Sequence, residues 1–271
     1  MRRAGVVGSP VAHSLSPVLH RAAYRALGLT DWRYDRHEVP AGALAAHVAG
    51  LGPEWVGLSV TMPGKEEALA LAATADEQAV LTGAANTLVR KQDGWAAHNT
   101  DVDGLIAALR EAGADRVRRA VVLGAGATAR SALVAVRRLR AEEVRLVTRS
   151  QPREETLSLA DRLGLRVTRS GLDDPVSGWG GPDVVVSTLP PGAGGPVEGA
   201  ERLAGAVVLD VVYAGWPTPW ASHLVAAGVD VVGGEGMLLH QAAEQVRLMT
   251  GRPAPLEAMR EALARHGRTG R

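Results

Sequence analysis

The chain has 271 residues, enough for one large domain or two ordinary ones, and 46% of them are hydrophobic, so it can bury a sizeable core. Its 30 basic and 29 acidic side chains nearly cancel, which gives no general electrostatic reason to bind nucleic acid or an anionic membrane and favours a small ligand. The absence of cysteine excludes disulfides and thiolate sites, and no apolar run has the length of a signal peptide or membrane helix, so we expect a cytoplasmic protein.

The first third of the chain alternates strand-like and helix-like segments. The apolar runs at 4–8 and 55–61 predict strands, and the segments 16–28 and 65–75 have the spacing of helices. Asp93-Gly94 predicts a hairpin turn. This alternation is typical of an α/β domain.

The central part of the chain carries six short apolar runs, which predict six strands. They lie at 120–123, 144–147, 165–168, 184–187, 207–212 and 229–232. Their continuous apolar character favours a doubly wound parallel sheet that is covered on both faces. Two helical segments follow, at 236–251 and 255–267, and we expect them to return to the N-terminal domain because they have no strand of their own to pack on.

A G-x-G-x-x-A pattern, formed by Gly124, Gly126 and Ala129, stands directly after the first of these strands and opens a helix. Glycines there let the backbone turn tightly and approach a pyrophosphate, which binds at the positive helix N-terminus. The alternative is an ordinary turn, since glycine is common between strands and helices. The six-strand context favours dinucleotide binding.

The end of the second strand indicates which dinucleotide binds. An NAD site usually carries an acidic residue there, whereas this chain has Thr148 and Arg149, with Arg153 four residues further on. Two guanidinium groups can clamp a 2′-phosphate, so the sequence predicts NADP. The alternative is two solvated arginines in a loop.

The segment "HSLSPVLH" predicts a helix start, with Ser16 as N-cap and Pro17 in the first turn. Capping does not account for Ser14. Two hydroxyl groups one residue apart, beside a helix N-terminus, can also bind a carboxylate.

Lys65 is predicted in the first turn of a helix, where a cation opposes the helix dipole. The ordinary alternative is a solvated lysine. In a cleft, and held by a carboxylate, this amine would suit proton transfer, and Asp101 is the candidate partner. Asp101 could instead cap a helix that begins near Gly104, and Asn86 could be a turn residue.

A set of motifs in fixed order then resembles the shikimate dehydrogenase family. The motifs are G-S-P-V-x-H-S-x-S-P-x-x-H, V-T-x-P-x-K, G-A-x-N-T-L, N-T-D-x-x-G, G-A-G-x-x-x-R, D-x-x-Y and M-L-x-x-Q. They run from about Gly8 to Gly251, nearly the whole chain.

The resemblance implies a two-domain α/β protein. Residues 1–102 with 237–271 would form the substrate-binding domain, and 103–236 a Rossmann domain that binds NADP. It implies reversible reduction of 3-dehydroshikimate to shikimate with NADPH, in chorismate and aromatic amino acid biosynthesis. No metal is expected, and a homodimer is allowed but not required.

Residue roles follow from the matched motifs. The implied catalytic pair is Lys65 and Asp101. The implied substrate contacts are Ser14, Ser16, Thr61, Asn86, Tyr213 and Gln241. The implied cofactor contacts are Gly124, Ala125, Gly126, Ala127, Thr128, Ala129, Thr148, Arg149, Arg153, Thr188, Gly234 and Met237.

The chain departs from the family pattern at Ser59, where many relatives have asparagine, at Gly64, which replaces an aromatic residue, and in "YAGWPTPW". These departures leave open a paralogue that oxidises quinate or an aminated shikimate. An NADPH-binding sensor without turnover is a second alternative. A methylene-tetrahydrofolate dehydrogenase is a third, although the N-terminal half supplies few aromatic side chains for stacking a folate.

Overall fold

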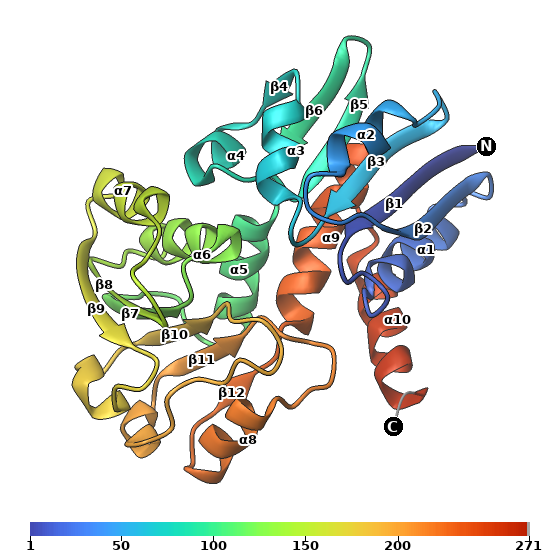
Figure 1. Cartoon of the computed structure of the whole chain (residues 1–271). Helices are drawn as coiled ribbons and strands as arrows, with labels where there is room; N and C mark the ends of the chain where they lie inside the picture. The colour runs from blue at the N-terminus through green and yellow to red at the C-terminus, as the bar shows by residue number, and fades with distance from the viewer. Residues whose placement is uncertain (270–271) are drawn as a thin grey trace. The chain divides into compact units, whose positions relative to one another are not determined.

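The computed structural model describes residues 1–269, with side chains up to His266. This part of the chain forms two compact units. The first contains Met1–Asp101 and the C-terminal part from Leu238 onward, and the second contains Val102–Met237. Each unit is an α/β structure with its own six-stranded sheet, labelled β1–β6 and β7–β12 in Figure 1.

The sheet of the first unit has the strand order β2-β1-β3-β5-β6-β4. Its strands are β1 (Arg2–Gly8), β2 (Trp32–Glu38), β3 (Trp55–Val60), β4 (Thr74–Ala75), β5 (Thr87–Lys91) and β6 (Gly94–His98). β1 pairs in parallel with β2 and β3, whereas β5 is antiparallel to both β3 and β6. The predicted hairpin is confirmed, but its turn lies one residue before Asp93-Gly94: Lys91 and Gly94 form the last pair of the β5–β6 ladder, so Gln92 and Asp93 make the turn.

Helices cover both faces of this sheet. They are α1 (Ser16–Ala26), α2 (Leu44–Ala49), α3 (Lys65–Leu71), α4 (Glu77–Thr82), α9 (Glu235–Thr250) and α10 (Leu256–Thr269). One face buries Leu58 of β3 with Leu44 of α2 and Ala68 of α3. The opposite face buries Tyr24 of α1 with Met249 of α9, and α10 packs against α1. The C-terminal helices therefore supply part of the first unit's core.

All strands of the second sheet pair in parallel, in the order β12-β11-β10-β7-β8-β9. They are β7 (Arg119–Leu123), β8 (Glu143–Thr148), β9 (Arg166–Gly171), β10 (Val184–Ser187), β11 (Val207–Asp210) and β12 (Val231–Val232). The helices are α5 (Asp101–Glu111), α6 (Ala127–Arg138), α7 (Glu154–Arg162) and α8 (Pro219–Ala226), with short 3₁₀ turns at Val176–Trp179 and Ala200–Leu203. In Figure 1, α6 and α7 lie above this sheet and α8 below it. This strand order is that of a Rossmann fold, whose halves meet between β7 and β10.

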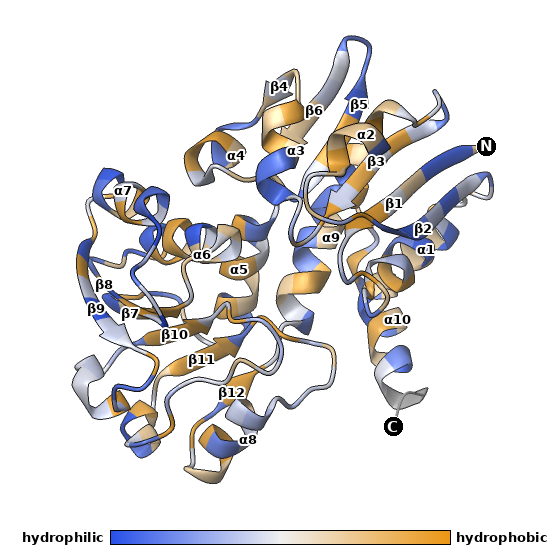
Figure 2. Ribbon diagram, in the orientation of Figure 1, coloured by the Kyte–Doolittle hydropathy of each residue, from blue (hydrophilic) through white to orange (hydrophobic). Residues whose placement is uncertain are grey.

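The predicted fold class is confirmed, and each of the six predicted central runs contributes a strand. In Figure 2, β10 and β11 are orange because both faces of the sheet are covered. The helix predicted over 65–75 ends at Leu71, and Thr74–Ala75 form β4 instead. β2 was not predicted. It is a sheet-edge strand of sequence WRYDRHE in which only Trp32 and Tyr34 are buried, so its apolar alternation is too short to recognise.

No helix within residues 1–269 combines the length and the apolar character that crossing a membrane requires.

Gly234 lies where the chain leaves β12, and its amide donates to Val212 O at 3.1 Å. A Cβ at this position would stand 2.0 Å from the carbonyl oxygen of Val211. Since that neighbour is backbone, it cannot move aside as a flexible side chain could.

We therefore expect Gly234→Ala to lower the free energy of unfolding by about 1–3 kcal/mol, the usual cost of forcing extra atoms into a packed site. Chemical denaturation followed by circular dichroism measures this. Gly178→Ala is the matched control, because a Cβ there meets nothing within 4 Å. Equal denaturation midpoints for the two variants would contradict the close approach.

Candidate active site

Lys65 and Asp101 form a buried ion pair in the first unit. Lys65 Nζ donates to Asp101 Oδ2 at 2.5 Å, and the side chains keep only 15% and 5% of their accessible surface. Lys65 is the first residue of α3 and Asp101 the first residue of α5. The pair is therefore assembled from two helix starts that are 36 residues apart. The alternatives of a solvated Lys65 and of Asp101 capping a helix near Gly104 are wrong.

The second oxygen of Asp101 is held by Asn86, which is 2% exposed. Asn86 Nδ2 donates to Asp101 Oδ1 at 2.7 Å and to Gln241 Oε1 at 3.3 Å. Asn86 Oδ1 accepts the backbone N–H of Thr100 at 2.9 Å. Asn86 is thus a buried structural partner of the carboxylate and not a simple turn residue.

The backbone before α5 is fixed by Asn99. Its Oδ1 accepts the amide of Asp101 at 3.0 Å, while its Nδ2 donates to Thr82 Oγ1 at 2.8 Å and to Ala84 O at 3.0 Å. Asn99 is 1% exposed, so these bonds form away from water. They fix the direction in which the Asp101 side chain leaves the helix start. Asn99 was not among the predicted site residues, although it stands in the quoted N-T-D motif.

Ser14 and Ser16 lie together at the N-terminus of α1 and are 8% and 5% exposed. The prediction that Ser16 is the N-cap is wrong, because α1 starts at Ser16 and Leu15 occupies the cap position without a side-chain bond. Ser14 Oγ instead accepts the Ser16 amide at 3.3 Å. Among the described residues the Ser16 hydroxyl makes no hydrogen bond, so it is not used for capping. Thr61 is a further predicted substrate contact. It directly follows β3 and is half-buried.

The loop that carries Ser14 is held by two side chains of β2. Arg36 donates to Ser14 O through Nε at 2.9 Å and through Nη2 at 2.6 Å. Glu38 Oε2 accepts the Val11 amide at 3.1 Å, and hydrogen bonds from Ser9 and Val11 hold the pKa of Glu38 below its usual value. Neither Arg36 nor Glu38 was predicted, because β2 itself was not.

In the second unit the glycine loop joins β7 to α6, and Thr188 lies against it. Thr188 Oγ1 donates to Leu123 O at 2.7 Å, and a Cβ on Gly124, whose φ is +103°, would stand 2.5 Å from that hydroxyl. A Cβ on Gly126 would meet nothing within 4 Å. Gly124 therefore allows the turn itself, while Gly126 leaves open space at the N-terminus of α6, as a bound pyrophosphate requires.

The other predicted residues of this loop are Ala125, which precedes Gly126, and Ala127, Thr128 and Ala129, which form the first turn of α6. The loop is tied to α7, since Thr156 Oγ1 donates to Ala125 O at 2.8 Å. Thr156 is fully buried and was not predicted.

Thr148, Arg149 and Arg153 follow one another on the segment between β8 and α7. Thr148 Oγ1 donates to Ser150 O at 2.6 Å, which tightens the turn. Arg149 and Arg153 are both exposed, and Arg153 is the N-cap residue of α7. The structure thus brings two guanidinium groups onto one loop, which Thr156 links to the glycine loop.

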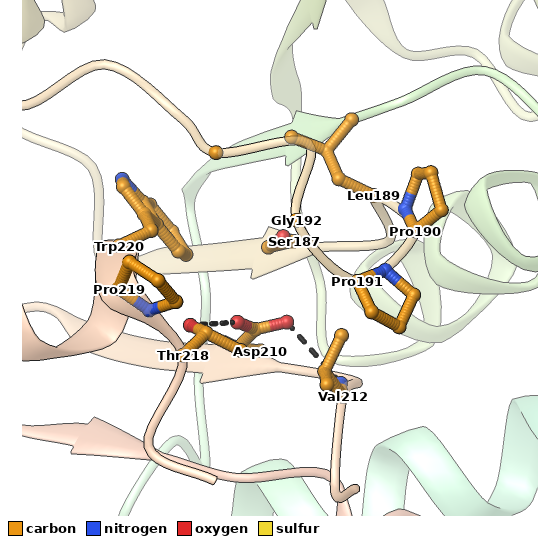
Figure 3. Close-up of a pocket in the computed structure, with 11 residues that line it drawn as sticks. Ser187, Leu189, Pro190, Pro191, Gly192, Asp210, Val212, Thr218, Pro219 and Trp220 are labelled. Atoms are coloured by element: carbon orange, nitrogen blue, oxygen red, sulfur yellow. Dashed lines mark hydrogen bonds between the residues drawn. The ribbon is translucent and has the colours of Figure 1, made fainter. Parts of the chain in front are cut away.

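A pocket lies at the carboxyl ends of β10 and β11 (Figure 3). Asp210 faces it and is 3% exposed. Asp210 accepts Thr218 Oγ1 at 2.9 Å and the Val212 amide at 3.2 Å. Burial raises the pKa of Asp210 above its usual value, although both bonds act in the opposite direction. This aspartate opens the D-x-x-Y motif, whose Tyr213 is half-buried just beyond it.

The last two predicted cofactor contacts are adjacent to the start of α9. Gly234 lies against the backbone of Val211, and Met237, which is 7% exposed, stands in the first turn of α9. Both belong to the second unit, whereas Gln241, 8% exposed on the same helix, belongs to the first.

Comparison with known proteins identifies the family. A family model described as "Shikimate dehydrogenase substrate binding domain" matches residues 6–88, and one described as "Shikimate 5'-dehydrogenase C-terminal domain" matches residues 234–264. A curated relative from Rubrobacter xylanophilus, named shikimate dehydrogenase (NADP(+)), is 39% identical over 97% of this chain and 95% of its own. The chain belongs to the shikimate dehydrogenase family.

Solved structures of the shikimate dehydrogenase family agree with this assignment. The Mycobacterium tuberculosis shikimate dehydrogenase is 45% identical with a TM-score of 0.85, over 97% of this chain and 99% of that chain. A Thermus thermophilus shikimate 5-dehydrogenase, solved in complex with NADP(H) and shikimate, is 31% identical with a TM-score of 0.81, over 98% of this chain and 99% of that chain.

A buried histidine, His20, contacts Gln245, whose side-chain amide donates to Asn86 O. His20 of α1 is fully buried, stacks on Tyr34 at 3.9 Å between ring centroids, and contacts Gln245 Oε1 through Nε2 at 3.3 Å. Burial lowers the pKa of His20 from 6.5 to about 3, although the bond to Gln245 acts in the opposite direction.

This histidine makes the folded protein less stable in mild acid. Between pH 6.5 and about 3 the unfolded chain binds a proton on His20 that the folded chain excludes, so the free energy of unfolding falls as the pH falls. The slope from this one group reaches at most about 1.4 kcal/mol per pH unit. We expect His20→Gln to show a shallower decline than the wild type in denaturation experiments between pH 6.5 and pH 4. Parallel declines would contradict a neutral buried His20.

Proposed function

We propose that this protein catalyses the reversible reduction of 3-dehydroshikimate to shikimate with NADPH, a step of aromatic amino acid biosynthesis. The observation that carries the proposal is the buried Lys65–Asp101 pair, with Asn86 and Gln241 bonded around it. The names of the family relatives, and the NADP(H) and shikimate bound in the Thermus thermophilus structure, support the substrate and cofactor.

Lys65 is proposed as the general acid. The chain has 28 arginines and only two lysines, Lys65 and Lys91, so its cationic positions are almost all arginine. An arginine would keep the ion pair with Asp101 but cannot release a proton at neutral pH, whereas an ammonium group can. A lysine at this buried position is therefore best explained by proton transfer.

The proposed step neutralises charge on the reacting oxygen. Bound NADPH supplies the hydride for the carbonyl carbon. Lys65 Nζ donates its proton to the carbonyl oxygen as negative charge develops there, and Asp101 keeps the amine pointed at that oxygen. In the reverse direction Lys65, as a neutral amine, accepts the hydroxyl proton.

The predicted substrate contacts are proposed to bind the carboxylate and the ring hydroxyls of shikimate. Ser14 and Ser16 would bind the carboxylate at the N-terminus of α1, where hydroxyl and amide donors meet the positive end of the helix. The ring hydroxyls would bond to Thr61, Asn86 and Gln241. Tyr213 is proposed beside the carboxylate.

The glycine loop and the β8–α7 loop are proposed to hold NADP. Open space at Gly126 allows a pyrophosphate to approach the α6 N-terminus, and Arg149 and Arg153 would bind the 2′-phosphate. On this basis we propose residues 103–236 as the cofactor domain, and 1–102 with 237–271 as the substrate domain. Thr188, Gly234 and Met237 are proposed to complete the nicotinamide end.

A cytoplasmic location and a homodimer stay predictions. Size-exclusion chromatography with light scattering tests the second.

A steady-state panel of shikimate and quinate, each with NADP⁺ and NAD⁺, tests the proposed function. We expect shikimate with NADP⁺ to give the highest kcat/KM. A preference for quinate would favour the paralogue that the departures at Ser59 and Gly64 leave open. Binding of NADPH without turnover of either substrate would favour the sensor.

Lys65→Ala should lower kcat by about 10²–10⁴, the usual contribution of general acid catalysis, with little change in KM for shikimate. Lys65→Arg should be nearly as slow although it keeps the charge. Lys91→Ala, at the exposed end of β5, is the control and should behave like the wild type. Normal kcat with a raised KM in Lys65→Ala would show Lys65 to be a binding residue.

Arg149→Ala should raise the KM for NADP⁺ by about tenfold or more and leave the KM for NAD⁺ nearly unchanged, because only NADP⁺ carries the 2′-phosphate. Arg162→Ala, in the last turn of α7, is the matched control. Equal effects on both cofactors would indicate that Arg149 supports the loop and does not bind the phosphate.

A further inference from the structure

Gln245 of α9 stands at the centre of a buried polar chain in the first unit. It is 1% exposed, and both ends of its amide are bonded. Its Oε1 accepts Ser59 Oγ at 2.5 Å and lies 3.3 Å from His20 Nε2. Its Nε2 donates to Asn86 O at 3.2 Å and to Thr87 Oγ1 at 3.0 Å. No motif of the sequence pointed to this residue.

The acceptor of each hydroxyl hydrogen in this chain follows from the other hydrogen bonds that the hydroxyl makes. Tyr34 OH donates to Ser59 Oγ at 2.5 Å, so the single Ser59 proton is directed to Gln245 Oε1. On the other side, Thr87 Oγ1 accepts from Gln245 and directs its own proton to Asn86 Oδ1 at 2.8 Å. The chain therefore runs in one direction, from Tyr34 through Gln245 to Asn86.

The far end of the chain is the catalytic carboxylate. With its oxygen turned to Thr87 and to the Thr100 amide, Asn86 presents its NH₂ group to Asp101 Oδ1 at 2.7 Å. The flipped amide would set a carbonyl oxygen against that carboxylate. In a buried site each such mismatch leaves a polar group without a partner, which is costly.

We propose that Gln245 is a positioning residue, which fixes the Asn86 amide through Thr87 and so holds Asp101 against Lys65. Its consequence for turnover rests on the proposed function. The inference also accounts for Ser59, where many relatives have asparagine. Here the small hydroxyl fits between Tyr34 and Gln245 and serves the chain.

Two substitutions of Gln245 by side chains of similar size distinguish the effect of hydrogen-bond direction from the effect of packing. Gln245→Met removes the amide, so kcat should fall. Because Thr87 can still donate to Asn86, the fall should be only about fivefold. In its ionised form Gln245→Glu offers only acceptors, so the Thr87 hydroxyl turns toward the new carboxylate and Asn86 loses that donor. Here kcat should fall about thirtyfold or more. The KM for NADP⁺ should stay unchanged in both variants.

Thr87→Val tests the coupling directly. It should lower kcat in the wild-type background and change little in Gln245→Glu, where Thr87 no longer donates to Asn86. Additive effects of the two changes, or a smaller loss in Gln245→Glu than in Gln245→Met, would overturn the proposal. Gln92→Glu on the exposed hairpin controls for the added charge, and Val246→Ala on α9, fully buried, controls for lost stability.

A second readout does not depend on turnover. The Asn86 side-chain amide signal in the ¹H–¹⁵N spectrum should shift in Gln245→Glu and Thr87→Val and stay in place in Gln92→Glu. If the wild type fails to oxidise shikimate, the proposed function fails, while this spectrum still decides the role of Gln245. An unshifted Asn86 signal in Gln245→Glu would refute that role.

Discussion

The charge pair between Lys65 and Asp101 is the interaction around which the first unit is organised. Removing two charges from water is costly, and their attraction offsets that cost only when the remaining polar atoms are also bonded. Here Asn86 takes the second carboxylate oxygen and Asn99 the Asp101 backbone, so the acid is fixed on three sides. These bonds hold the Lys65 amine at a defined place beside Asp101.

The second unit also brings residues that are distant in sequence together. Parallel strands end at one edge of the sheet, so residues distant in sequence meet there without special sequence patterns. Thr188 after β10 reaches the glycine loop after β7, and Thr156 of α7 bonds to the same loop. The Rossmann topology thereby brings Thr188 and Thr156 against the glycine loop, while Arg149 and Arg153 lie on the neighbouring segment between β8 and α7.

Much of this fold could be predicted from the sequence because buried parallel strands are continuously apolar. Apolar runs predicted all six strands of the second unit, although the edge strands β9 and β12 contain no buried residue. β2 was not predicted because an edge strand needs few apolar residues. Arg36 and Glu38, which lie on β2, were therefore not predicted either. The Ser16 cap was wrong because α1 starts one residue earlier than the Ser-Pro pattern suggests and uses Leu15 as N-cap. Gln245 was missed for another reason, since hydrogen bonds between distant segments leave no spacing signal in one chain. Thr87 and Asn99 were missed although both stand in the quoted motifs.

The most direct test of the account is a crystal structure of the protein with shikimate and NADP⁺ bound. The account predicts that one ring hydroxyl oxygen lies within about 3.2 Å of both Lys65 Nζ and a carboxylate oxygen of Asp101. It also predicts the substrate carboxylate at Ser14 and Ser16. Shikimate bound with its carboxylate on Lys65, or with no hydroxyl near Asp101, would contradict the central claim.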